Sequence, residues 1–325
     1  MVSTKKWPLR ALIISGAALT AYTLLLVPTQ GQQPPQAAEQ TPVILNVLVT
    51  DKHNRPVSDI TQDQLQIFDD GIPQTISFFS KEVIPISYAL VVDISGSLRK
   101  QFGRVIEAAK AIVENNQSND DTFLIAFRDK AEAVLPDFTS DKASLWNEIG
   151  EFYRWKGGQT ALIDAIYLSL DPLIEHRKNE GPAQRRRAVI LISDGEDHAS
   201  YYKEDELLKR LSKETVQVFA IALTSDLNDR DIFPSKNPRE RATNLLKRLA
   251  KETGGYVLLA ESKSNMQSLA KDAMLYLHTQ YVVAYNRANR ARDGSYHKVL
   301  ARVMDKPGGE KRTTITRVGY TTDKR

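Results

Sequence analysis

The chain has no cysteine among its 325 residues. Disulfide bridges, thiolate nucleophiles, iron–sulfur clusters and cysteine-bound zinc are therefore excluded. Three enzyme motifs are also missing: the GxxxxGK[ST] phosphate loop, the GxGxxG dinucleotide fingerprint and the GxSxG elbow of serine hydrolases. None of the five histidines is placed by the sequence as a catalytic base. These absences remove common routes to catalysis, and we expect a protein that is not an enzyme.

Long apolar runs are scarce, and only residues 11–27 approach the length of a membrane span. They follow Lys5, Lys6 and Arg10, and residues 1–31 contain no acidic residue. A basic segment followed by an apolar one is the layout of a secretory signal. Two alternatives stay open for residues 1–31, a cleaved signal peptide or an N-terminal membrane anchor. Both predict an extracytoplasmic location: secreted, periplasmic or anchored to the membrane.

The formal net charge of +4 overstates how basic the folded part is. Three basic residues lie in the N-terminal segment, and the rest of the chain is nearly balanced. We therefore predict no nucleic-acid partner. The basic run Arg185-Arg186-Arg187 precedes an apolar strand, and we interpret it as a solvated loop.

Two flanking segments show the pattern of β-strands. Residues 32–41, rich in glutamine, proline and alanine, are interpreted as a linker to the first of them. In residues 42–84, Asp-Gly at 70–71 predicts a hairpin whose return strand covers 75–79. Residues 279–325 follow with candidate strands at 281–285, 296–303 and 313–320. We predict that 42–84 and 279–325 together form one small, discontinuous β domain.

Between these flanks, residues 85–278 alternate apolar strands with amphipathic helices. The strand at 88–92 is continuously apolar, as expected when both faces of a sheet are covered. A last helix at 264–278 has an apolar stripe, and the next strand begins at residue 281. The alternation predicts an α/β domain with a doubly wound, mostly parallel sheet and helices on both faces.

Oxygen-bearing side chains gather where strands of this sheet end. The first strand is followed by Asp93-Ile94-Ser95-Gly96-Ser97, and a later one by Ser193-Asp194-Gly195. A third segment, Gly157-Gly158-Gln159-Thr160, places a hydroxyl at the start of a helix. Because ligands bind at the carboxyl ends of strands in open α/β sheets, these segments are expected to converge. Carboxylates and hydroxyls are ligands for hard cations such as Mg²⁺.

This set of residues resembles the metal-ion-dependent adhesion site of von Willebrand factor type A (VWA) domains. The motif DxSxS, a later threonine after Gly-Gly and a later aspartate in a Ser-Asp-Gly turn occur in the same order. The flanks resemble, more loosely, a bacterial family of exported VWA-related proteins. The resemblance implies a site for Mg²⁺ (or Mn²⁺) made by five residues. These are Asp93, Ser95, Ser97, Thr160 and Asp194.

The resemblance implies separate roles for these ligands. Ser95 and Ser97 would bind the metal directly, and Thr160 directly or through water. Asp93 and Asp194 would hold metal-bound waters. Neutral hydroxyl ligands compensate the metal's charge poorly, so the metal is expected to take a Glu or Asp carboxylate from a partner protein. We therefore predict a metal-dependent protein-binding module, an adhesion or scaffold protein of the cell envelope.

Two alternatives are kept. One is a metal-dependent phosphoryl-transfer enzyme with Asp93 as nucleophile, but such enzymes use DxD, and here Ser95 occupies the place of the second acid. The other is a structural envelope protein whose metal only stabilises the fold. In that case the stability of the protein would depend on the metal, but its binding of a partner would not.

Overall fold

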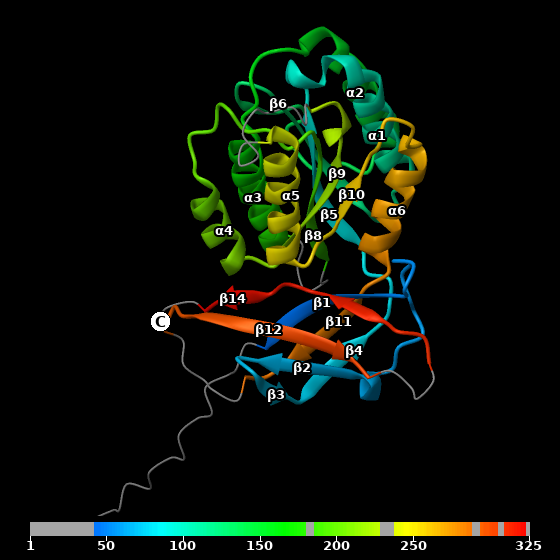
Figure 1. The fold of residues 1–325 in the computed structure, drawn as a ribbon, viewed down its shortest axis with the longest axis vertical. Helices are drawn as coiled ribbons and strands as arrows, with labels where there is room; N and C mark the ends of the chain where they lie inside the picture. Colours follow the sequence, from blue (N-terminus) through cyan, green and yellow to red (C-terminus); the bar gives the residue numbers. More distant parts are fainter. Residues whose placement is uncertain (1–41, 180–184, 228–236, 288–292, 305–308, 323–325) are drawn as a thin grey trace, which may run out of the picture. The chain divides into compact units, whose positions relative to one another are not determined.

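The computed structural model describes residues 42–179, 185–227, 237–287, 293–304 and 309–322 (Figure 1). Residues 40–325 form one compact unit. The predicted signal or anchor at 1–31 and the linker at 32–41 lie outside the described residues. Within the described ranges, no helix has both the length and the apolar character needed to cross a membrane.

A central six-stranded sheet has the order β10-β9-β8-β5-β6-β7. All neighbouring strands pair in parallel except β7, which is antiparallel to β6. Every residue of β5 is buried, and its side chains alternate between the two faces of the sheet. The strands are β5 (Ile86–Asp93), β6 (Asp121–Phe127), β7 (Ala131–Ala133), β8 (Arg186–Ser193), β9 (Val216–Ala222) and β10 (Val257–Leu259).

Helices cover both faces of this sheet, which confirms the predicted doubly wound α/β fold (Figure 1). One face packs against α1 (Phe102–Glu114), α2 (Lys142–Trp155) and α6 (Met266–His278). The other face packs against α3 (Leu162–Asn179), α4 (Glu204–Lys213) and α5 (Pro238–Thr253).

Helix α2 is the one long helix that we did not predict. Its buried residues Leu145, Ile149 and Phe152 have helical spacing, but most of its surface is polar or exposed. The Asp141 side chain caps it by accepting hydrogen bonds from the N–H groups of Ala143 and Ser144. This stripe is narrow, so it is easily overlooked in the sequence.

Two antiparallel sheets are built from the flanking segments and enclose a third core, to which Leu45, Ile67 and Val283 belong. Their orders are β13-β1-β11-β4 and β14-β12-β2-β3. The domain division at 42–84, 85–278 and 279–325 stays a prediction, because residues 40–325 are one compact unit. The strands are β1 (Val43–Thr50), β2 (Leu65–Asp69), β3 (Ile72–Gln74), β4 (Ile76–Ser80), β11 (Tyr281–Tyr285), β12 (Tyr296–Val303), β13 (Thr313–Ile315) and β14 (Gly319–Thr321).

Two strand predictions were wrong in detail. The turn at Asp70 and Gly71 exists, with φ of 51° and 80°, but its return strand is β3 rather than 75–79. The next strand, β4, pairs with β11 in the other sheet. The predicted strand at 313–320 is two strands, β13 and β14, in different sheets. The chain turns between them at Arg317, whose buried guanidinium donates to the carbonyls of Gly319, Ser212 and Glu214.

The prediction of a solvated loop at Arg185–Arg187 was also wrong. Arg186 and Arg187 are the first residues of β8 and are only 3% and 4% exposed. The Arg186 guanidinium donates hydrogen bonds to the carbonyls of Leu277, His278 and Gln280, at and just after the end of α6. A helix C-terminus has unsatisfied carbonyls and partial negative charge, so it accommodates a buried cation.

Candidate metal centre

The three predicted segments meet at the carboxyl end of the central sheet. Asp93 ends β5, and Asp194 directly follows β8, its neighbour in the sheet. The Gly96 N–H donates to the Gly158 carbonyl at 2.9 Å, and the Gly157 N–H donates to the Ile94 carbonyl at 2.8 Å. These two backbone hydrogen bonds join the first loop to the glycine-rich loop.

The glycine-rich loop is joined in turn to the loop after β8. The Thr160 carbonyl accepts hydrogen bonds from the N–H groups of His198, at 2.8 Å, and Ala199, at 2.9 Å. Thr160 itself is buried, with 1% of its surface exposed. The structure thus brings together the backbones of all three segments that carry the five predicted site residues.

Asp93 is fully buried and held by hydrogen bonds at both of its oxygens. Its Oδ1 accepts from the Ser95 N–H at 2.9 Å, and its Oδ2 accepts from the Ser193 hydroxyl at 2.7 Å. The Ser193 hydroxyl also accepts from the Gly195 N–H at 2.9 Å. Each carboxylate oxygen keeps a lone pair beyond these contacts. Ser193 therefore orients the acid, a role that we did not predict.

Asp194 is buried in the site, whereas Ser97 is in contact with solvent. Asp194 is 1% exposed, and its Oδ1 accepts from the Glu196 N–H at 3.1 Å. Its carboxylate also interacts with the Ser97 hydroxyl, which lies 2.9 Å from the Ser95 hydroxyl. Ser97 is exposed. The hydroxyl pair therefore bridges the buried acids and the protein surface.

The electrostatics of the site are unfavourable without a cation. Burial and, second to it, the negative charge of Asp194 raise the pKa of Asp93 to about 7. Burial also raises the pKa of Asp194, although its hydrogen bond with Ser97 acts against this. Among the described residues, no lysine or arginine forms a salt bridge with either carboxylate. Two buried acids without a lysine or arginine partner favour a bound cation.

Asp129 supports the glycine-rich loop, a role that we did not predict from the sequence. Gly158 has φ of +89°, and a Cβ there would lie 2.4 Å from Asp129 Oδ2. The Asp129 Oδ1 accepts a hydrogen bond from the Gln159 N–H at 2.8 Å. Asp129 follows β6, the strand next to β5. Its position at the same edge of the sheet is the sequence feature from which this role could have been predicted.

The donor set fits a hard divalent cation. It offers carboxylates from Asp93 and Asp194 and hydroxyls from Ser95, Ser97 and Thr160, and no sulfur. Oxygen-only sets suit Mg²⁺ and Mn²⁺. Bound there, such an ion would supply a Lewis-acidic position for an anionic oxygen.

A second cluster, Asp69, Asp70 and His297, brings two carboxylates and an imidazole within 4.8 Å of one another. Asp69 Oδ2 already accepts hydrogen bonds from the hydroxyls of Tyr285 (2.8 Å) and Tyr320 (2.7 Å). Asp70 Oδ2 lies 2.7 Å from His297 Nδ1. These hydrogen bonds satisfy the acids within the β sheets, and we interpret the cluster as structural.

Part of the chain matches a known family. Residues 88–196 match the family described as von Willebrand factor type A domain. This range includes all five predicted ligands. The chain therefore contains a VWA domain. No curated protein matches the chain.

Several solved structures are similar to the chain. An aerotolerance-related membrane protein from Bacteroides fragilis is 20% identical, with a TM-score of 0.46, over 59% of this chain and 98% of that one. A von Willebrand factor type A protein from Catenulispora acidiphila is 11% identical, with a TM-score of 0.47, over 87% and 75%. Proximal thread matrix protein 1 from the mussel byssus, solved with zinc in its MIDAS motif, is 17% identical, with a TM-score of 0.44, over 65% and 49%.

The raised pKa of Asp93 predicts how metal and pH act together on stability. Since the folded state binds this proton more tightly than the unfolded state, stability of the metal-free protein falls as pH rises from about 4 to about 7. Excess Mg²⁺ should therefore raise the melting temperature more at about pH 8 than at about pH 5. Thermal unfolding with Mg²⁺ or EDTA at both pH values measures this difference. An equal rise at both would contradict the prediction.

Proposed function

We propose that the chain is a metal-dependent protein-binding module that catalyses nothing. It holds Mg²⁺ or Mn²⁺ at Asp93, Ser95, Ser97, Thr160 and Asp194, and the metal takes a Glu or Asp carboxylate of a partner protein. The observation that carries the proposal is the pair of buried acids without a lysine or arginine partner among the described residues, joined to the surface by the exposed Ser97. An ion in this setting is reachable from solvent on the hydroxyl side.

The surface beside the site supports a protein partner. Trp155 and Tyr153 end helix α2 and are 38% and 49% exposed. Trp155 lines a small hollow of about 170 Å³ with Ile94, Arg128 and the pair Lys130 and Glu132, which form a salt bridge at 3.3 Å. Exposed aromatic residues and arginine are the side chains that contribute most at protein interfaces. The charge of Arg128 would favour an acidic partner.

The enzymatic alternative has little support from the site. Ser95 stands where phosphoryl-transfer enzymes with DxD place their general acid, and its hydroxyl lies 2.9 Å from the Ser97 hydroxyl. The hydroxyl cannot donate a proton as a carboxylic acid does near neutral pH. The structural alternative, in which the metal only stabilises the fold, predicts partner binding that survives loss of the metal.

We further propose that the chain works outside the cytoplasm, at the cell envelope. Residues 1–31, basic and then apolar, would act as a signal peptide or an N-terminal anchor.

Partner capture from an envelope extract tests the binding proposal. Wild-type protein is compared in Mg²⁺ and in EDTA, beside Asp93→Asn and the control Asp205→Asn, an exposed acid on α4. We expect one partner to be retained by wild type and control in Mg²⁺ and lost in EDTA and in Asp93→Asn. Amide substitutions on that partner should then reveal one essential acid. Equal retention in EDTA would support the structural alternative instead.

A further inference from the structure

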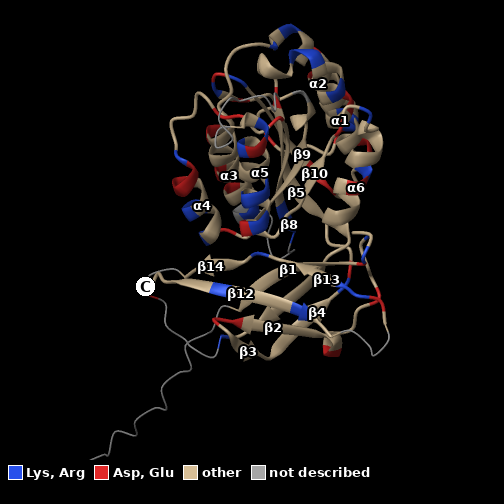
Figure 2. Ribbon diagram, in the orientation of Figure 1, with Lys and Arg blue, Asp and Glu red and all other residues tan. Residues whose placement is uncertain are grey.

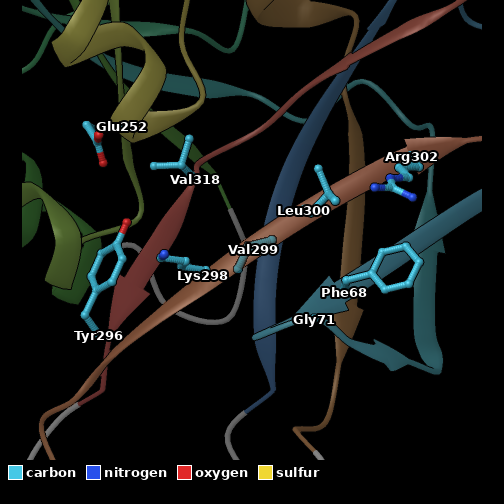
Figure 3. Close-up of a pocket in the computed structure, with 9 residues that line it drawn as sticks. All are labelled: Phe68, Gly71, Glu252, Tyr296, Lys298, Val299, Leu300, Arg302 and Val318. Carbon is cyan, nitrogen blue, oxygen red and sulfur yellow. The ribbon is translucent and has the colours of Figure 1, made fainter.

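A groove outside the metal centre follows the exposed face of β12. Tyr296, Lys298, Leu300 and Arg302 follow one another along this face, because alternate residues of a strand point the same way (Figure 3). The intervening residues, such as Val299, are buried. The hollow above this face has a volume of about 860 Å³. Its other lining residues are Phe68, Gly71, Glu252, Val299 and Val318.

A second hollow of about 550 Å³ continues the first. Both are lined by Val299, Leu300 and Val318. The second adds residues from α5 and β10, among them Lys247 and Lys251, and residues from the segment 314–316. The two hollows make one groove between α5, β10 and β12, which we name the β12 groove.

The β12 groove exposes more apolar surface than scattered residues would. Tyr296, Leu300 and Leu259 are 45%, 46% and 44% exposed, and all three line the groove. Single exposed apolar residues are common on protein surfaces, but an aligned set within a hollow is typical of a binding site. The groove also contains the outer side of β10, which pairs only with β9 at the edge of the central sheet. An edge strand can pair with an added extended segment.

The charges around the groove are almost all positive. Figure 2 shows basic residues on β12 and on α5. Four cations line the groove, against the single carboxylate of Glu252, which interacts with the Tyr296 hydroxyl. In the part of the chain that the structure describes, none of the four forms a salt bridge, although Arg302 stacks over the Phe68 ring at 5.4 Å. The four are Lys247, Lys251, Lys298 and Arg302.

We propose that the β12 groove binds an extended, acidic segment of a partner protein whose groove-facing side chains, at every second position, are acidic and apolar in turn. Lys298 and Arg302 are four residues apart on one strand, or about 13 Å. Every second side chain of an extended segment lies on the same face, so acids four residues apart can face both cations. Apolar side chains two residues from these acids, on the same face, then lie over Leu300 and Tyr296. The charge balance selects an acidic segment, and the apolar floor favours a polypeptide over a purely ionic ligand.

The test uses a fluorescently labelled peptide of about ten residues that repeats Glu-Ser-Val-Ser, so that glutamate and valine share one face of the extended peptide. Titration is followed by fluorescence anisotropy in EDTA, so that the metal centre has no part in the result. We expect binding by the wild-type chain and a loss of at least about 10-fold in affinity for the double variant Lys247→Glu/Lys298→Glu. The matched control is Lys209→Glu/Lys271→Glu, which reverses two exposed lysines on α4 and α6.

The apolar floor is tested separately by Leu300→Asn, which should also weaken binding. All of these side chains are exposed, so the fold is expected to persist, and circular dichroism checks it. Hydrogen exchange on the wild-type chain gives a second readout: the peptide should protect β10 and β12. The same peptide with lysine in place of glutamate should not bind.

Four results would overturn the proposal. The first is equal loss of affinity in the control double variant, and the second is wild-type affinity in Leu300→Asn, which would mean unspecific charge attraction. The third is protection outside the groove. The fourth is binding of single-stranded DNA or anionic phospholipid vesicles at the groove when the peptide does not bind.

Discussion

Replacing Asp93 by asparagine is expected to reduce Mg²⁺ affinity by at least about 10- to 100-fold. Asparagine has nearly the same shape, and its Oδ1 can still accept from the Ser95 N–H, while its Nδ2 can donate to the Ser193 hydroxyl, which reverses that hydrogen bond. What it removes is one of the two negative charges that face the cation. Isothermal titration calorimetry with Mg²⁺ and Mn²⁺ measures the loss. Zn²⁺ is included as a third ion.

The same substitution should leave the metal-free protein as stable as before, or more stable. Burial raises the pKa of Asp93, which means that the charged form is unfavourable in the metal-free fold. A neutral amide avoids this cost. Loss of metal binding with an unchanged or raised melting temperature in EDTA would separate a ligand role from a folding defect. The control Asp205→Asn should bind Mg²⁺ as wild type does. Wild-type affinity in Asp93→Asn would remove this residue from the site.

Replacing Arg186 by methionine is expected to destabilise the fold by about 3–5 kcal/mol, the largest stability effect that we predict. Methionine keeps most of the apolar stem but removes every hydrogen bond to the Leu277, His278 and Gln280 carbonyls. Buried acceptors that lose their donors cost about 1–3 kcal/mol each. Burial lowers the pKa of Arg186 to about 10, so the side chain is still charged at neutral pH.

Urea denaturation measures this change in the free energy of unfolding. Arg154→Met is the matched control, since Arg154 is exposed on α2 and pairs only with Glu151 in a surface salt bridge. It should change stability by less than about 1 kcal/mol. Arg186→Lys should recover only part of the lost stability, because an ammonium lacks the planar fork of donors with which a guanidinium reaches several carbonyls. Equal stability of Arg186→Met and Arg154→Met would show that the three carbonyls do not depend on Arg186.

The Arg186 contacts also bear on how α6 is connected to the strands after it. The Tyr276 hydroxyl donates to the Asn54 carbonyl at 2.6 Å, and His278 Nε2 lies 2.8 Å from Asp120 Oδ2. With Arg186, these contacts hold the end of α6 from three directions. Strand β11 starts three residues after α6 ends, as the sequence predicted. Any shift of α6 would therefore have to break or carry these contacts.

The sequence alone was sufficient for the fold class and for the candidate ligands. Continuous apolar strands alternating with amphipathic helices have one common solution, a covered parallel sheet, so local pattern and global fold agree. The ligand positions followed from the same rule, because residues directly after parallel strands share one edge of the sheet. Asp93 and Asp194 needed no tertiary information beyond that.

Only the tertiary structure determined the features in which polar groups from distant segments form hydrogen bonds with one another. Arg186 looked like part of a solvated loop because its partners, the carbonyls at the end of α6, lie about 90 residues away in sequence, as the Leu277 contact shows. Asp129 and Ser193 support the site through hydrogen bonds that no spacing rule specifies. The chain passes from one sheet to the other between β3 and β4 and between β13 and β14, within one to three residues. Which strand each of them pairs with depends on residues that are distant in the sequence. Burial of polar groups without water makes each of these long-range partners necessary, and only the folded chain determines which partner is in reach.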